Sequence, residues 1–344
     1  MKQTRAIGTQ NIAFNGLVDS AGAITGTPGT FVGSGTLALA SNHLGRTSYQ
    51  PGYRLELGYR TPEGMRYSVS WLHLNNHRYS GGASFAPANP FVGANLADTF
   101  LFSPVFNFGP NFAGAPNRIT IGGAAAPGAI NGIWNGATNM TIDFNQQFDN
   151  WDVTARVPIV GMDTELARTY AMAGGRFSWF FERFNWRTES FNIDTAGNLT
   201  GSGAFNARYT NTLSQRMYGV FLGSGHEIYL PGGVAANLEL TAAPLVAIVK
   251  EKAKYVRGDD FNQAKRTNFD SKLVLNGTAA LNFTWYPSFM PGMMMRAGYT
   301  GNLFMNTVYM DEPVGFNFGS IDPAYSKKLF RIIHGCNFGI GYVW

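Results

Sequence analysis

The side chains that could perform catalysis are few, and their spacing matches no known catalytic set. The chain has five histidines. His226 and Glu227 begin a zinc-protease pattern, but Leu230 stands where the second histidine is required. His73 follows two serines on its strand, yet no acidic residue close in the sequence could orient it. We therefore expect no enzymatic activity, no catalytic residues, no bound metal and no cofactor.

A second group of chemically active side chains is a row of ten charged residues that alternate with apolar ones. Such alternation places charge on one face of a β-strand and apolar groups on the other. Six basic residues against four acidic ones predict a mild preference for anions if water fills the space that they line. The alternative is that these charges pair across strands and fill a narrow barrel. The ten residues are Arg54, Glu56, Arg60, Arg66, Asp152, Arg156, Arg176, Glu182, Glu239 and Arg296.

Strands with this alternation recur along most of the chain. The clearest pair extends from Tyr53 to Leu74, where two alternating runs flank the turn Thr61-Pro62-Glu63-Gly64. Each run carries apolar groups on one face and polar or charged groups on the other. Further pairs are predicted at 141–157 with 168–182, at 216–226 with 234–249, and at 273–286 with 293–304, followed by a last strand at 331–344.

The composition places these strands in a membrane. Charged residues make up 14% of the chain, against about 25% in an average soluble domain. Hydrophobic residues make up 45%, but none of their runs reaches the ~18 residues that a membrane helix needs. The 42 glycines and 14% aromatic residues suit a barrel with small lumen-facing positions and interfacial rings. We predict one all-β domain over residues 1–344, an antiparallel transmembrane β-barrel in the bacterial outer membrane.

The strand count requires one more strand than the pattern shows. Nine strands are visible, whereas a barrel formed by one bacterial chain has an even number. Closure is needed because unpaired backbone groups facing hydrocarbon each cost several kcal/mol. We expect the closing strand near 10–17 or 36–40, or in sequence upstream, because no signal peptide is visible at the start. Ten strands are favoured and twelve remain an alternative.

The connections are expected to be asymmetric, with short periplasmic turns and long extracellular loops. The long ones fall at 75–140, 191–215, 251–270 and 306–328. The first of these carries a run of phenylalanines over 100–112, which is too apolar for a solvated tether. It could fold over the barrel mouth, enter the lumen as a constriction, or contact a neighbouring protein.

The last strand resembles the terminal strand of bacterial outer-membrane barrels. Its outward row ends on Tyr342 and Trp344. In such proteins the barrel-assembly machinery recognises this terminal strand. The lone Cys336 cannot form an internal disulfide. The basic residues are scattered, so we expect no nucleic-acid partner. The expected partners are membrane lipid, lipopolysaccharide, the assembly machinery and small solutes, with a homo-oligomer or other envelope proteins as further candidates.

Several segments together resemble the planctomycete outer-membrane β-barrel family, porin-like proteins loosely akin to the major outer-membrane protein of Legionella. They lie at 52–59, 172–177, 218–223, 295–299, and 334–335 ahead of 339–344, in the family's order. Family members usually open with an apolar, tryptophan-bearing strand, which this chain lacks. The resemblance implies a barrel without catalytic residues or an established substrate. It supports a porin-like passive channel for small hydrophilic solutes, with a structural barrel in a larger surface or membrane assembly as the alternative.

Overall fold

The computed structural model describes most of the chain. The described residues are 1–19, 26, 30–31, 35–84, 98–109, 112, 120–121, 124–125, 133–134, 137–159, 161–162, 164, 166–189, 192–193, 199–200, 206–260 and 263–343.

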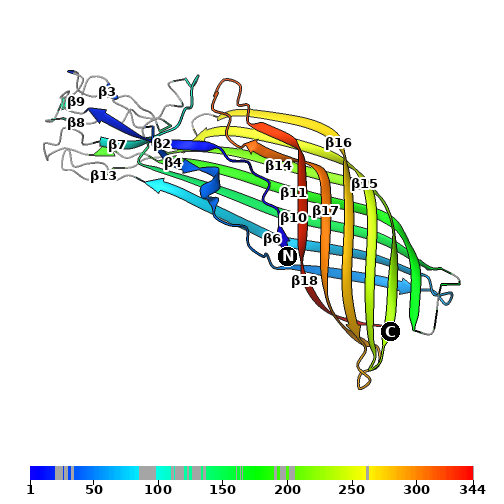
Figure 1. The fold of residues 1–344 in the computed structure, drawn as a ribbon. Coiled ribbons are helices and arrows are strands. Elements are labelled where there is room, and N and C mark those ends of the chain that lie inside the picture. Colours follow the sequence, from blue (N-terminus) through cyan, green and yellow to red (C-terminus); the bar gives the residue numbers. More distant parts are fainter. Residues whose placement is uncertain are drawn as a thin grey trace.

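One ten-stranded antiparallel sheet curls into an elongated barrel, as Figure 1 shows. This confirms the predicted fold class. All four predicted hairpins form, as β5 with β6, β10 with β11, β14 with β15, and β16 with β17. In sheet order the strands are β1 (Lys2–Gln3), β18 (Ala324–Tyr342), β17 (Met293–Glu312), β16 (Gln263–Trp285), β15 (Val234–Arg257), β14 (Asn206–Leu230), β11 (Ala167–Glu189), β10 (Asn139–Pro158), β6 (Arg66–Ser84) and β5 (Gly52–Arg60).

Most strands are about twice as long as a membrane requires. The strands β6, β10, β11 and β14 to β18 have 19 to 25 residues. About 9–11 tilted residues suffice to cross a bilayer. The strands therefore continue beyond the membrane, and the predicted loops 191–215 and 251–270 are strand over 206–215, 251–257 and 263–270. The connections between strands there shorten to 190–205 and 258–262.

The barrel is closed by the first residues of the chain. In β1, Lys2 pairs with His334 of β18, and Lys2 also bridges to Tyr49 just before β5. The backbone oxygen of Met1 accepts a hydrogen bond from the Gln50 amide at 2.6 Å. Because β5 and β18 run in the same direction, β1 lies antiparallel to both and completes the antiparallel order of the barrel. Within the described part of the chain, this is where backbone bonds link the two edges.

Both predicted positions of the closing strand were wrong. Residues 10–17 and 36–40 instead contribute to β2 (Asn11–Asp19) and β4 (Leu37–Ala40), which pair in a separate small sheet. A strand of two residues carries no alternation, so the sequence pattern could not reveal β1.

A bulkier residue at Gly335 should open this closure. A Cβ atom added there would lie 2.7 Å from the Cα of Met1, whereas one at Gly339 on the same strand would meet nothing within 4 Å. We expect Gly335→Val to cost about 1–3 kcal/mol of stability and to accelerate amide hydrogen exchange at residues 2–4. Gly339→Val is the matched control. Equal exchange in both variants would contradict closure by β1.

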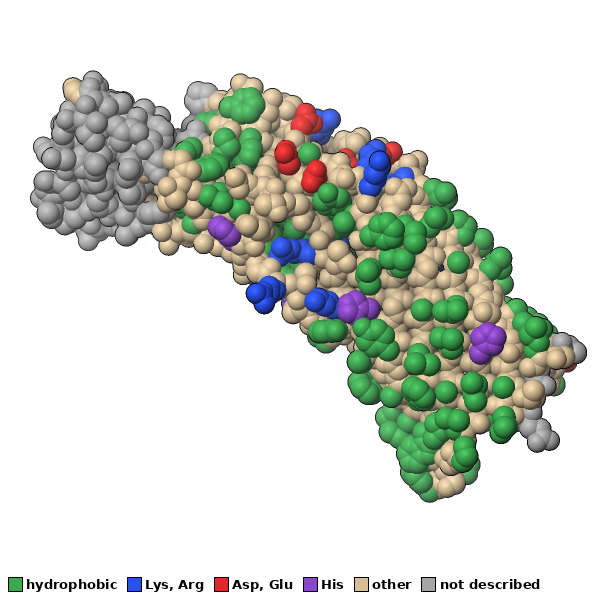
Figure 2. Space-filling model, viewed as in Figure 1, with side chains coloured by type: hydrophobic (Ala, Val, Ile, Leu, Met, Phe, Trp, Pro, Cys, Tyr) green, Lys and Arg blue, Asp and Glu red, His purple; other side chains and the backbone are tan. Residues whose placement is uncertain are grey.

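Apolar side chains cover the outside of the lower half of the barrel, as Figure 2 shows, and charged side chains gather above them. Leu222, Val220 and Phe338 are 69%, 67% and 83% exposed. On β11 the outward row from Trp179 down to Ala167 is uncharged, with Thr169 as its polar member. At about 3.3 Å per residue and a tilt of about 45°, this row spans roughly 28 Å of membrane. The chain is a β-barrel of the bacterial outer membrane, with its short turns at the periplasmic end.

No helix among the described residues is long and apolar enough to cross a membrane.

A folded cap covers the extracellular end of the barrel (Figure 1). There β2 pairs with β3 (Thr30–Phe31), β4 and β7 (Asp98–Phe102), and the 3₁₀-helix η1 (Ser41–Leu44) follows β4. Leu101 and Val105 of the long aromatic loop are buried, and the ring of Phe112 lies 4.5 Å from that of Phe318. Of the three arrangements considered, this part of the loop therefore folds over the mouth. Short two-stranded ribbons are β8 (Thr120–Ile121) with β9 (Ala124–Ala125) and β12 (Asn192–Ile193) with β13 (Leu199–Thr200).

Candidate functional site

The lower lumen holds an interlocked set of charged side chains. Asp152 and Arg176 are direct register partners on β10 and β11, and both point inward. The guanidinium of Arg176 donates from Nε to Asp152 Oδ1 at 2.8 Å and from Nη2 to Oδ2 at 3.1 Å. It also donates to Thr278 at 2.9 Å and lies 4.9 Å from the ring of Phe221. Arg176 is thus held by both walls of the lumen and is only 6% exposed.

A second group of ion pairs crosses the lumen below Arg176. Arg156 on β10 lies 3.2 Å from Glu239 on β15 and 3.6 Å from Glu56 on β5. Glu56 also lies 3.7 Å from Arg296 on β17. The Tyr170 hydroxyl donates to Glu239 at 2.8 Å. These pairs join strands that are not neighbours in the sheet, so they tie the opposite walls together.

The space left between these side chains is small. It is a cavity of about 50 Å³. On this measure about 10–15 Å³ is enough to hold one water molecule, so the cavity admits a few water molecules. Seven of the predicted lumen-lining residues surround it: Arg54, Glu56, Asp152, Arg156, Arg176, Glu239 and Arg296.

The other three predicted residues lie above and below this cavity. Arg66 lies near the periplasmic end, 3.7 Å from Glu227, and Arg60 is the last residue of β5. Glu182 lies above the cavity, is fully buried, and forms an ion pair with Arg331. The prediction omitted Arg331 from the site, although the inward phase of the last strand placed it in the lumen.

The upper lumen contains a cluster of buried phenylalanine rings, which the sequence analysis did not anticipate. The rings of Phe148 and Phe180 lie 4.9 Å apart, and the ring of Phe304 lies 5.0 Å from that of Phe180. All three side chains are almost completely buried. The outward neighbours of Phe180 are also aromatic, so no alternation distinguished the inner face from the outer one.

The amino-terminal segment is hydrogen-bonded to the upper part of the barrel. Gln146 donates to the backbone oxygen of Thr4 at 3.2 Å, and Gln10 exchanges two 2.8 Å hydrogen bonds with the backbone of Val314. The Gly8 amide donates to Met310 at 2.7 Å. The segment from Thr4 to Gln10 is therefore bonded to the inner wall and to the inward-folded connection between β17 and β18.

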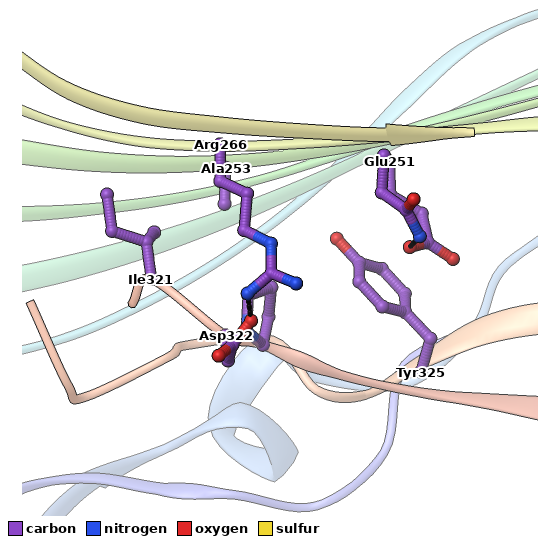
Figure 3. A pocket seen from close by; sticks show the side chains of 8 residues that line it. Glu251, Ala253, Arg266, Ile321, Asp322 and Tyr325 are labelled. Atoms are coloured by element: carbon purple, nitrogen blue, oxygen red, sulfur yellow. Dashed lines mark hydrogen bonds and ion pairs between the residues drawn. The ribbon is translucent and has the colours of Figure 1, made fainter. Parts of the chain in front are cut away.

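A small surface pocket of about 60 Å³ lies beside that connection, between β15, β16 and the start of β18 (Figure 3). Arg266 and Asp322 form an ion pair at one side of it. Tyr325 faces Glu251 at the other side in Figure 3, and its hydroxyl donates to Asn211 at 2.6 Å. The charged groups that line the pocket thus have partners within the chain.

The adhesion-like tripeptide at the end of β15 forms side-chain hydrogen bonds within itself. In the Arg257-Gly258-Asp259 turn, the Arg257 guanidinium donates to both carboxylate oxygens of Asp259, at 2.8 and 2.6 Å. This side-chain hydrogen bonding raises the pKa of Arg257 above its ordinary value. Within the described part of the chain, no group of three His, Cys, Asp or Glu side chains is placed to hold a metal ion.

The predicted assembly signal is only partly described. Tyr342 lies on the outer surface and is 58% exposed. Trp344 lies outside the described residues. The role of both residues in assembly stays a prediction.

Comparison with known proteins gives likenesses to outer-membrane proteins. Neither a family model nor a curated protein matches the chain. The outer-membrane protease OmpT from Escherichia coli is 11% identical with a TM-score of 0.31, over 100% of this chain and 95% of that one. OmpT of Vibrio cholerae, an outer-membrane protein folded in vitro, is 9% identical with a TM-score of 0.14, over 100% and 97%. At these scores the likenesses transfer no residue or reaction to this chain.

The expectation of no enzymatic activity is not retained. One of its premises was wrong: His73 does have an acidic partner, because Asp149 is its register partner on β10. The Nδ1 atom of His73 lies 2.7 Å from Asp149 Oδ1, and the Trp71 indole donates to the same oxygen at 3.1 Å. Asp149 lies 76 residues away in the sequence, so a search for neighbouring acids could not find it.

Proposed function

We propose that the protein is a closed structural barrel that anchors a folded cap at the outer surface of the outer membrane. The single observation that carries this proposal is the occupied upper lumen. The Thr4 to Gln10 segment is bonded to the inner wall there, and the buried phenylalanines and the Arg331–Glu182 pair lie inside the barrel at the same end. We also propose that the chain belongs with the planctomycete barrels, on the sequence segments that resemble them.

Buried contacts favour a stable filling over a movable gate. Arg331 and Glu182 are both 0% exposed, and the guanidinium also donates to the hydroxyl of Thr307 at 3.0 Å. To open a path, these groups would separate and the Gln10–Val314 bonds would break. Opening would also expose the buried rings of Phe148, Phe180 and Phe304 to water, which costs free energy, so an open state is expected to be rare.

The passive diffusion channel is the second candidate, favoured by the polar lower lumen. Its charged side chains would give the mild anion preference if water filled the space. Against it stands the pairing of most of these charges with one another, since a paired charge contributes little to selectivity.

Planar-bilayer recordings on the folded full-length protein test the proposal. We expect no steady ion conductance under a salt gradient, whereas a channel-forming porin reconstituted in parallel gives stepwise openings. Reproducible steps from this protein would reject the closed barrel and support the channel. In that case Arg176→Gln with Arg296→Gln should shift the reversal potential toward cations, and an unchanged value would remove these arginines from the path.

A further inference from the structure

The outer surface carries a dense basic face just above the apolar belt. It lies on four adjacent strands, β11, β14, β15 and β16, and its side chains share the outward phase of the lipid-facing rows below. Six of them are well exposed, and Lys252 and Lys254 are half-buried. The eight residues of this basic face are Arg183, Arg187, Arg208, Arg216, Lys250, Lys252, Lys254 and Lys265.

The strand register places these charges side by side. Lys254 pairs directly with Lys265, and Arg187 pairs directly with Arg208. Neighbouring strands lie about 4.8 Å apart, and like charges directly opposite each other destabilise a sheet. Anions from outside the sheet would therefore reduce the repulsion between the side chains of the basic face.

Acidic side chains of the same four strands do not neutralise the basic face. Among the described residues in the upper part of these four strands, the acid in the outward phase is Glu189. It is the last residue of β11, where its carboxylate accepts a hydrogen bond from Asn139 at 3.2 Å. The acids Glu182 and Glu251 point inward and are buried.

Aromatic rings fix the depth of the basic face in the membrane. The guanidinium carbon of Arg216 lies 6.0 Å from the ring of Trp179, and the Lys250 ammonium lies 5.2 Å from the ring of Phe269. Aromatic girdles mark the boundary between hydrocarbon and headgroups. Because this is the end with the cap, the basic face meets the headgroups of the outer leaflet.

We propose that this basic face binds the phosphate groups of outer-leaflet lipopolysaccharide. The continuous apolar surface beneath it favours a lipid over free phosphate, since Val246 and Leu273 are each 55% exposed directly below the basic rows. A phosphorylated glycolipid would place its phosphates among the lysines and its acyl chains against these residues.

Binding of defined lipids to the folded full-length protein tests the proposal by native mass spectrometry. The probes are diphosphoryl lipid A, the same lipid without phosphates, and inorganic phosphate as a competitor. Replacing Lys250, Lys252 and Lys254 with glutamine should weaken binding of diphosphoryl lipid A about tenfold or more, given the strength of single lysine contacts with anionic membranes. The same lysines changed to arginine should retain it.

A charge-matched control separates a site from general attraction. It replaces Lys2, Arg46 and Lys328, which lie outside the four strands, with glutamine. Heat-dependent migration in gels first establishes that each variant is folded. Equal weakening in both glutamine variants, or equal binding of the phosphate-free lipid by the wild type, would overturn the proposal. Full displacement of lipid A by millimolar inorganic phosphate would overturn the lipid assignment and leave a free-phosphate site.

Discussion

Replacing Glu182 with alanine should lower the free energy of unfolding by about 3–5 kcal/mol, because it leaves the Arg331 guanidinium buried without its counter-charge. Arg331 Nη2 donates to Glu182 Oε2 at 2.9 Å, and the guanidinium carbon lies 4.7 Å above the ring of Phe180. Neither side chain is exposed to solvent. Urea unfolding of the protein in detergent or vesicles, followed by tryptophan fluorescence, measures the loss.

A double variant distinguishes the buried charge from lost packing. With Glu182→Leu and Arg331→Met together, no unpaired charge remains, and we expect stability much closer to the wild type. If Glu182→Ala costs less than about 1 kcal/mol, as expected for a solvated ion pair, then water reaches Arg331. That result would also count against the filled lumen on which the structural role depends.

The fold class and the strand pairs were predictable because alternation is a local signal. Phe338 outside and Arg331 inside follow directly from the two-residue period of the last strand. Strand ends were less predictable, because at the tops of β14 and β15 polar side chains face outward and the outward apolar row stops. The period indicates that a residue faces the lumen but not how full the lumen is.

The parts that the sequence did not reveal depend on distant contacts. Residues 2–3 form a strand only because the edges of β5 and β18 leave room between them. The Arg331–Glu182 pair joins residues 149 positions apart, and His73 meets Asp149 only through the β6–β10 register. A register shift between Gln146 and Phe148 further changes which side chains of β10 meet β6. These contacts become visible only when the sheet is assembled.

Replacing Leu240 with arginine should destabilise the inserted barrel by about 2–4 kcal/mol, because a lipid-facing arginine near the bilayer midplane is poorly solvated. Leu240 is 46% exposed on the outside of β15, midway along the apolar belt. Its register partners are Ser224 and Ala279, whose side chains offer no carboxylate to the new guanidinium. Folding yield into lipid vesicles and urea unfolding of the inserted protein measure the effect.

The matched control is Ser271→Arg, which places the same side chain on the outside of β16 but at the upper edge of the belt. Ser271 is the register partner of Ile248, one row below Lys250 and Phe269. The cost of an outward arginine falls to about 0–1 kcal/mol near the interface, so this variant should insert nearly as well as the wild type. The difference between the two variants isolates depth in the membrane. Equal insertion of both would mean that the row through Leu240 does not face hydrocarbon, which would contradict the assigned position of the bilayer and, with it, the headgroup depth of the basic face.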